Sequence, residues 1–256
     1  MIQIQNLSYL RNDESILNQI NLEILPGQHW IILGRNGAGK TTLINLLYGY
    51  IWPSSGKITV FGTEYGTEPL RPIQEQIGIL QSNQQSNLLQ RNLTTLEILI
   101  SGLHSNLGIY REITDKDIAT AETLLEQNEL SHLKDRNFQI LSSGEKSKIL
   151  LLRSIIRKPK VLILDEPTSS LDIKACYEFF QLLEKIIVKQ NITCVQIVHR
   201  LEDIPKYFTH IAMMKKGEIL YSGKIDSTLN LQNLSNLYDL PQDWFQSFQV
   251  FNSSMP

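Results

Sequence analysis

The sequence has few cysteines, no long apolar run and no excess of charge of either sign. Cys176 and Cys194 are its two cysteines, and both lie in apolar stretches without the spacing of a metal site, so we expect reduced, buried thiols. The apolar runs are far shorter than the ~20 residues of a membrane-spanning helix. The 24 Lys and Arg residues nearly balance 26 Asp and Glu residues, which gives no general basis for binding nucleic acid or anionic lipid.

The first residues contain neither a basic segment nor a long apolar segment. We therefore expect no secretory signal and a cytoplasmic location. Hydrophobic residues make up 42% and charged residues 20% of the 256 positions, which is typical of a globular protein. At about 150 residues per domain, this length permits one large domain or two small ones.

Strand-like and helical segments alternate along the chain, which predicts an α/β fold. Apolar or alternating runs predict strands at residues 2–4, 22–24, 30–33, 56–61, 77–80, 161–164, 193–198, 211–214 and 218–221. Helical spacing predicts a helix from Lys40 to Tyr48 that ends at Gly49. It also predicts helices within residues 94–133, 148–156 and 173–187.

A phosphate-binding motif lies between the strand at 30–33 and the helix that begins near Lys40. The match to G-x-x-x-x-G-K-[ST] comprises Gly34, Arg35, Asn36, Gly37, Ala38, Gly39, Lys40 and Thr41. Glycines let consecutive backbone N–H groups surround phosphate oxygens, and a helix N-terminus adds a positive dipole. We expect Lys40 to bind the β- and γ-phosphates of a nucleotide, Thr41 to bind Mg²⁺ and Thr42 to bond near the α-phosphate.

Two adjacent carboxylates follow the apolar strand at residues 161–164. Ligands bind at the carboxyl ends of strands in open α/β sheets, so Asp165 and Glu166 are candidates for a site there. We expect Asp165 to reach the Mg²⁺ shell. Glu166 is then the candidate catalytic residue that orients or deprotonates the attacking water.

A third motif opens a helical run at residues 141–145. Ser142 and Glu145 match the S-x-x-E capping box. The order of phosphate loop, this segment and the carboxylate pair resembles the ATP-binding cassette (ABC) family over nearly the whole chain. Residues 165–172 look like that family's second nucleotide motif running into its D-loop, and His199 stands at the position of its switch histidine.

The resemblance implies a P-loop NTPase fold with a mixed sheet, an N-terminal antiparallel β-subdomain and an inserted helical subdomain. It places the ATP-binding core at residues 1–80 and 142–228, the helical subdomain at 81–141 and a C-terminal tail at 229–256. The implied function is an ATPase that binds ATP and Mg²⁺ and powers a separate membrane permease. The chain is then peripheral on the inner face of the cell membrane.

The resemblance also implies that two cassettes pair head to tail as a homodimer or paired cassette. Ser142 and Gly144 of one cassette then complete the γ-phosphate site of the other, and His199 contacts the γ-phosphate as a further catalytic residue. Direct contact with nucleic acid is not expected. The tail carries Trp244, Phe245, Phe248 and Phe251, for which core packing or a dimer contact are both open.

Four positions depart from the family pattern. The aromatic residue that stacks on adenine corresponds to Arg11, with Tyr9 two residues earlier as the alternative. The family's Q-loop glutamine corresponds to position 82, which is a serine in this chain, and Gln81 is the residue before it. Either residue is therefore a candidate Mg²⁺ ligand, and we favour Gln81. In the signature, Ser143 replaces a glycine and Glu145 replaces a glutamine.

Two other functions compete with transport. A soluble cassette acting on ribosomes or nucleic acid is disfavoured because the chain has one motif set and no long coiled-coil insertion. A small-molecule kinase does not explain residues 141–145 or His199. Residues 49–56 and 101–110 resemble molybdenum-import-like ATP-binding proteins, which is weak guidance to a cargo because cassettes rarely touch the cargo.

Overall fold

The chain folds as two units in the computed structural model, which describes residues 1–81, 92–104 and 113–246. Unit 1 consists of Met1–Ile73 and Thr193–Pro256, and unit 2 is Gln74–Ile192. The short helix α2 (Arg71–Gln74) lies where the chain passes from the first unit to the second.

Unit 1 contains an antiparallel sheet at its N-terminal end. Its strands are β1 (Ile2–Arg11), β2 (Glu14–Ile24), β4 (Ser55–Val60) and β5 (Thr63–Glu64), in the order β2-β1-β4-β5. Each pair of neighbours is antiparallel. In β1, Ile2 and Ile4 are buried while Gln3 and Gln5 are exposed, the alternation expected of a sheet with one covered face. The predicted N-terminal antiparallel β-subdomain is confirmed.

A second, mixed sheet in unit 1 leads into the phosphate loop. Its strands are β3 (His29–Gly34), β8 (Thr193–Val198), β9 (His210–Lys215) and β10 (Glu218–Lys224). Strand β3 pairs in parallel with β8 and β9, and β9 and β10 form an antiparallel hairpin. Residues 30–34 are all buried, as in a parallel strand covered on both faces, and the strand ends at Gly34.

The helices of unit 1 are α1 (Lys40–Tyr48), α8 (Ile225–Thr228), α9 (Leu231–Tyr238) and α10 (Gln242–Gln246), with a short 3-10 helix η3 (Leu201–Asp203). Helix α1 has the predicted bounds, and Gly49 closes it in a left-handed conformation. In the tail, Phe245 is buried and Trp244 is exposed. Phe248 and Phe251 lie outside the described residues.

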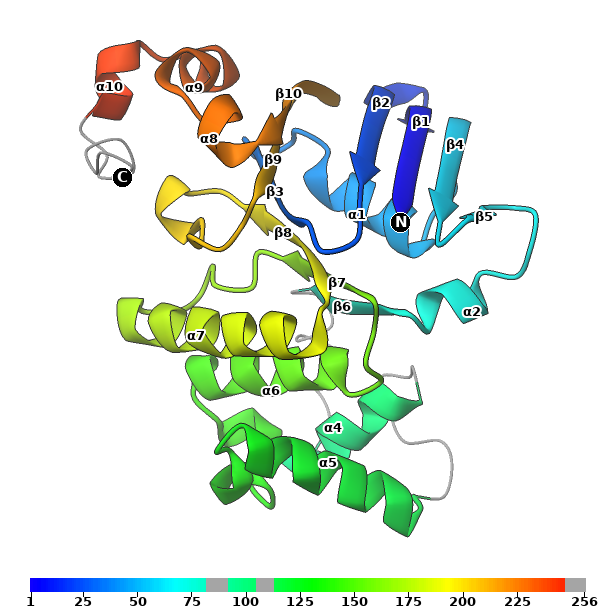
Figure 1. Ribbon diagram of the computed structural model, residues 1–256, viewed down its shortest axis with the longest axis vertical. Helices are drawn as coiled ribbons and strands as arrows, with labels where there is room; N and C mark the ends of the chain where they lie inside the picture. The colour runs from blue at the N-terminus through cyan, green and yellow to red at the C-terminus, as the bar shows by residue number, and fades with distance from the viewer. Residues whose placement is uncertain (82–91, 105–112, 247–256) are drawn as a thin grey trace. The chain divides into compact units, whose positions relative to one another are not determined.

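Unit 2 combines two parallel strands with a group of helices. Strands β6 (Ile77–Gln81) and β7 (Val161–Asp165) are parallel and buried throughout. The helices are α4 (Thr95–Leu103), α5 (Asp115–Gln127), α6 (Ser143–Ile155) and α7 (Ile173–Gln190), with η1 (Ser131–Leu133) and η2 (Phe138–Ile140). Helices α6 and α7 lie side by side (Figure 1).

The capping box predicted at Ser142 and Glu145 is confirmed as the start of α6, so the helical run expected at residues 148–156 begins earlier, at Ser143. The expectation that Cys176 is buried is wrong. The first turns of α7 face solvent: Ile173 is 92% exposed and Tyr177 is 65% exposed, since the buried stripe of α7 starts at Phe179. For the same reason Cys176 is partly exposed. Cys194 in unit 1 is buried as predicted, and desolvation raises the pKa of its thiol.

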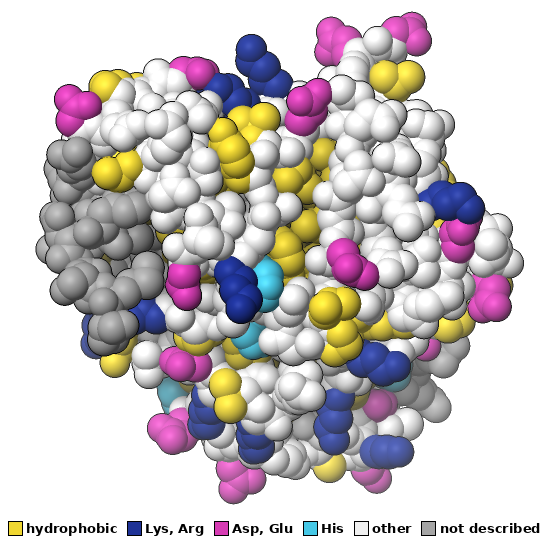
Figure 2. Space-filling model, turned by 45° about the horizontal axis from the view of Figure 1, so that its top comes forward, with side chains coloured by type: hydrophobic (Ala, Val, Ile, Leu, Met, Phe, Trp, Pro, Cys, Tyr) yellow, Lys and Arg dark blue, Asp and Glu magenta, His cyan; other side chains and the backbone are white. Residues whose placement is uncertain are grey.

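Charged side chains of both signs are interspersed over the described part of the face shown in Figure 2. This arrangement agrees with the near balance of 24 basic and 26 acidic residues in the sequence. Among the described residues, none of the helices combines the length and apolarity that crossing a membrane requires.

Candidate nucleotide site

The phosphate loop of unit 1 is closely packed at Gly34 and at Gly39. A Cβ atom on Gly34 would lie 2.3 Å from the backbone oxygen of Met214 on β9. Gly39 has φ +95°, and a Cβ there would lie 2.6 Å from Cδ2 of Leu17 on β2. The glycines at both ends of the loop are therefore required by close packing, and the second also by its backbone conformation.

Lys40 is held inside this loop. Its side chain is only 5% exposed, and its Nζ donates hydrogen bonds to the carbonyl oxygens of Gly34 at 2.8 Å and Arg35 at 3.0 Å. The Nδ1 atom of His199 lies 3.4 Å from the same Nζ. The structure thus brings together the predicted phosphate-binding cation and the predicted switch histidine, because β3 and β8 are parallel neighbours whose carboxyl ends meet.

Lys40 is the first residue of α1, so the N-terminus of this helix lies at the end of the loop. Gly39 is its N-cap residue, no side chain of the described residues caps it, and its first turn holds no acidic residue. A helix start of this kind favours an anion through its dipole and its backbone N–H groups. Thr41 is exposed and Thr42 is partly exposed on this turn, and the loop residues Arg35 and Asn36 are exposed.

Two of the predicted metal ligands are register partners in unit 2. Gln81 ends β6 and Asp165 ends β7, and the two residues face each other in the parallel pairing. Their exposed fractions are 2% and 6%. A buried amide oxygen and a buried carboxylate at one strand end are ligands of the type that Mg²⁺ accepts. Ser82, the alternative to Gln81, lies outside the described residues.

Glu166 begins the turn that follows β7. Its backbone is left-handed, with φ 53°, a conformation that is uncommon for residues other than glycine and often occurs at functional sites. Its carbonyl accepts a hydrogen bond from the N–H of Ser169. The turn then leads to Asp172, whose Oδ1 accepts a hydrogen bond from the N–H of Ala175 at 2.8 Å and caps α7.

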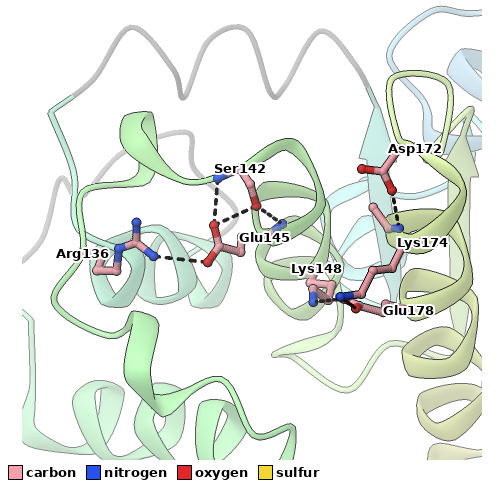
Figure 3. A network of polar contacts seen from close by, with 8 residues as sticks. Arg136, Ser142, Glu145, Lys148, Asp172, Lys174 and Glu178 are labelled. Atoms are coloured by element: carbon pink, nitrogen blue, oxygen red, sulfur yellow. Dashed lines mark hydrogen bonds and ion pairs between the residues drawn. The ribbon is translucent and has the colours of Figure 1, made fainter.

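The start of α6 is a complete capping box (Figure 3). The Oγ of Ser142 accepts from the N–H of Glu145 at 3.3 Å, while Oε2 of Glu145 accepts from both the N–H and the hydroxyl of Ser142 at 2.8 Å. Ser142 is exposed and Gly144 is buried in the first turn. These bonds lower the pKa of Glu145, chiefly through the N–H of Ser142, so the carboxylate is charged at neutral pH.

Comparison with known proteins decides the family. The sequence model of the family described as ABC transporter matches residues 17–169. The chain is 34% identical to the uncharacterised ABC transporter ATP-binding protein YmeB of Lactococcus lactis, over 93% of this chain and 92% of that protein. The chain belongs to the ABC transporter ATP-binding family.

Further relatives agree with this assignment. The zinc uptake system ATP-binding protein ZurA of Listeria monocytogenes is 27% identical over 87% of this chain and 85% of that protein. The solved structure of cbiO1 from Clostridium perfringens, part of the ABC transporter complex cbiONQ, has a TM-score of 0.76 at 29% identity and covers 87% of this chain and 88% of that one. This ABC protein is thus the nucleotide-binding ATPase subunit of a transporter, with the P-loop fold expected from the sequence.

Several contacts of this ABC protein were not predicted from its sequence. Arg136 Nη1 lies 3.2 Å from Oε1 of Glu145. Arg35 Nη1 lies 4.0 Å from Asp239 at the end of α9. The first pair could have been predicted from the sequence: Glu145 carries a charge that the family's usual glutamine lacks, and Arg136 is a basic residue that precedes the signature.

The two candidate adenine contacts, Tyr9 and Arg11, both lie on β1. Tyr9 pairs with Leu17 across the β1–β2 register, and Leu17 is the residue that packs against Gly39. Arg11 is exposed and pairs with Glu14, which lies three residues before Leu17 on β2. Both residues remain candidates.

Proposed function

We propose that this ABC ATPase binds ATP with Mg²⁺ on the phosphate loop of unit 1. The observation that carries the proposal is the burial of Lys40 among loop carbonyls at an N-terminus of α1 that no described side chain caps. Lys40 exchanges these carbonyls for the β- and γ-phosphate oxygens. The backbone N–H groups of residues 34–39 hold the same phosphates, and Thr42 bonds near the α-phosphate.

We keep the three Mg²⁺ ligands expected from the sequence. Thr41 supplies a hydroxyl, and Asp165 and Gln81 supply oxygens. The register pairing and burial of these last two residues support the assignment. When bound, Mg²⁺ neutralises charge on the phosphate oxygens.

Hydrolysis needs a group that handles the proton of the attacking water. We assign this role to Glu166, which follows the metal-ligand strand and holds a left-handed turn, and we assign the γ-phosphate contact to His199. Arg11 or Tyr9 contacts the adenine. The domain division predicted from the sequence, with core residues 1–80 and 142–228, helical residues 81–141 and a tail at 229–256, is kept as part of this proposal.

We further propose that two copies, or this chain and a similar cassette, pair when ATP is bound. Ser142 is exposed at the N-terminus of α6, where its hydroxyl and the helix dipole suit the γ-phosphate of a second cassette. Gly144 contributes its backbone N–H there. Pairing couples closure to a membrane permease, so the chain acts at the inner face of the membrane. The molybdenum-import-like branch stays a prediction from the sequence.

The proposal is tested by isolating the native complex. Membranes are solubilised in detergent, the tagged chain is captured, and copurifying proteins are identified by mass spectrometry. We expect a polytopic membrane protein in stoichiometric amount. The ATPase rate of the captured complex should fall to background when this chain carries Glu166→Gln. Recovery of ribosomal proteins or nucleic acid in place of a membrane protein contradicts the transport assignment.

A further inference from the structure

The signature segment of this chain contains a charge that conflicts with its proposed ligand. Glu145 is a carboxylate with a lowered pKa, three residues after Ser142. A phosphate group that approaches Ser142 therefore approaches a negative charge. Two negative charges so close together repel each other. Phosphate binding at Ser142 therefore requires that the charge on Glu145 be neutralised by a nearby cation.

Arg136 provides this compensation in the structure. Its Nη1 lies 3.2 Å from Oε1 of Glu145, and the side chains of this pair are 44% and 24% exposed. Figure 3 shows Glu145 between Arg136 and Ser142. His132 adds a smaller favourable charge interaction with the same carboxylate.

Hydrogen bonds hold the backbone of residues 136–138 in place, and this positions the side chain of Arg136. The carbonyl of Arg136 accepts hydrogen bonds from the N–H of Thr95 at 2.9 Å and from its hydroxyl at 3.2 Å. The N–H of Phe138, which is fully buried, donates to the carbonyl of Leu93 at 2.9 Å. These bonds tie the backbone at Arg136 to the start of α4, and the side chain of Arg136 reaches Glu145 in the first turn of α6.

The hydroxyl of Ser142 has one proton to donate. It donates that proton to Oε2 of Glu145 at 2.8 Å, whereas a phosphate oxygen also requires a donor. Arg136 forms an ion pair with the same carboxylate. The ion pair neutralises the charge of Glu145 and makes the carboxylate a weaker hydrogen-bond acceptor for Ser142.

We propose that Arg136 is a positioning residue for the signature: it neutralises Glu145 so that the hydroxyl of Ser142 is available to the γ-phosphate bound by the partner cassette. This inference rests on the proposed pairing of two cassettes. It goes beyond that proposal because it assigns a role to a residue outside the three nucleotide motifs, required by the Glu at position 145.

The test compares ATP-driven pairing in a hydrolysis-deficient background, Glu166→Gln. The ATP concentration for half-maximal dimer is measured by size-exclusion chromatography with light scattering. Arg136→Gln should raise this concentration about four- to ninefold, because an exposed pair contributes about two- to threefold and a symmetric dimer contains it twice. Adding Glu145→Gln should restore it to within about twofold, since glutamine keeps the capping box without the charge.

Controls separate this role from a structural one. Lys134→Gln removes the same charge two residues earlier, where Lys134 pairs with Glu122, and should leave pairing unchanged. Arg136→Lys should restore part of the loss. Affinity of the monomer for a fluorescent ATP analogue should stay the same in every variant, because the phosphate loop is intact.

The outcomes are distinct. A dimer that forms equally well with Arg136→Gln overturns this inference alone, as does a loss that Glu145→Gln fails to rescue, since a purely structural role for the pair predicts no rescue. Absence of any dimer in Glu166→Gln itself overturns the proposed pairing of two copies, and this inference with it.

Discussion

Replacing Lys40 by alanine should remove most of the affinity for ATP. In the structure, Nζ bonds to the carbonyl oxygens of Gly34 and Arg35 at 2.8 and 3.0 Å, and the side chain is 5% exposed. Binding exchanges these neutral carbonyl oxygens for negatively charged phosphate oxygens, which adds the attraction of opposite charges in a buried place. Truncating one partner of a buried charge pair costs about 2–5 kcal/mol, so we expect affinity to fall about 30- to 5,000-fold.

The assay is isothermal titration calorimetry with a non-hydrolysable ATP analogue. Lys57→Ala is the matched control, because Lys57 is an exposed lysine paired with Glu64 on the antiparallel sheet. The free energy of unfolding of Lys40→Ala should change by only about 1–2 kcal/mol, since loss of its hydrogen bonds is offset by relief of a buried cation. An affinity within threefold of the parent chain would refute the reasoning.

Three further predictions follow from the same geometry. Glu166→Gln should keep ATP affinity within about threefold yet abolish phosphate release, because the amide keeps the shape and loses the base; equal turnover would exclude Glu166 as the base. Gln81→Ala should weaken the Mg²⁺ dependence of turnover more than Ser82→Ala, and the reverse order would assign the ligand to Ser82. Gly39→Ala should lower the free energy of unfolding by at least about 1 kcal/mol in urea titrations, because φ at this position is +95° and the added Cβ would clash with Leu17; unchanged stability would contradict this packing.

Local features of the site were predictable because short sequence signals determine them. Helix α1 runs from Lys40 to Tyr48 and closes at Gly49 as its apolar spacing and terminal glycine predict. The capping box that starts α6 is read from Ser142 and Glu145 alone. Both depend on residues within one or two turns of the chain.

Long-range contacts could not be predicted in the same way. The pairing of Arg136 with Glu145 depends on the path of the chain through η2, which lies between the two residues. The pairing of Arg35 with Asp239 joins the phosphate loop to the end of α9. Periodicity also cannot tell exposed apolar residues from buried ones: Ile173 fits the helical spacing of α7 and is nevertheless 92% exposed. The assignments of Gln81, Asp165 and Glu166 as ligands and base stay predictions.

Pairing of cassettes on ATP is the central claim, and the mass of the Glu166→Gln variant tests it most directly. The chain has a mass of 29.3 kDa. Light scattering after size-exclusion chromatography should give twice this mass with ATP and Mg²⁺ and the monomer mass with ADP. A monomer mass with ATP and Mg²⁺ at all workable protein concentrations would contradict the account.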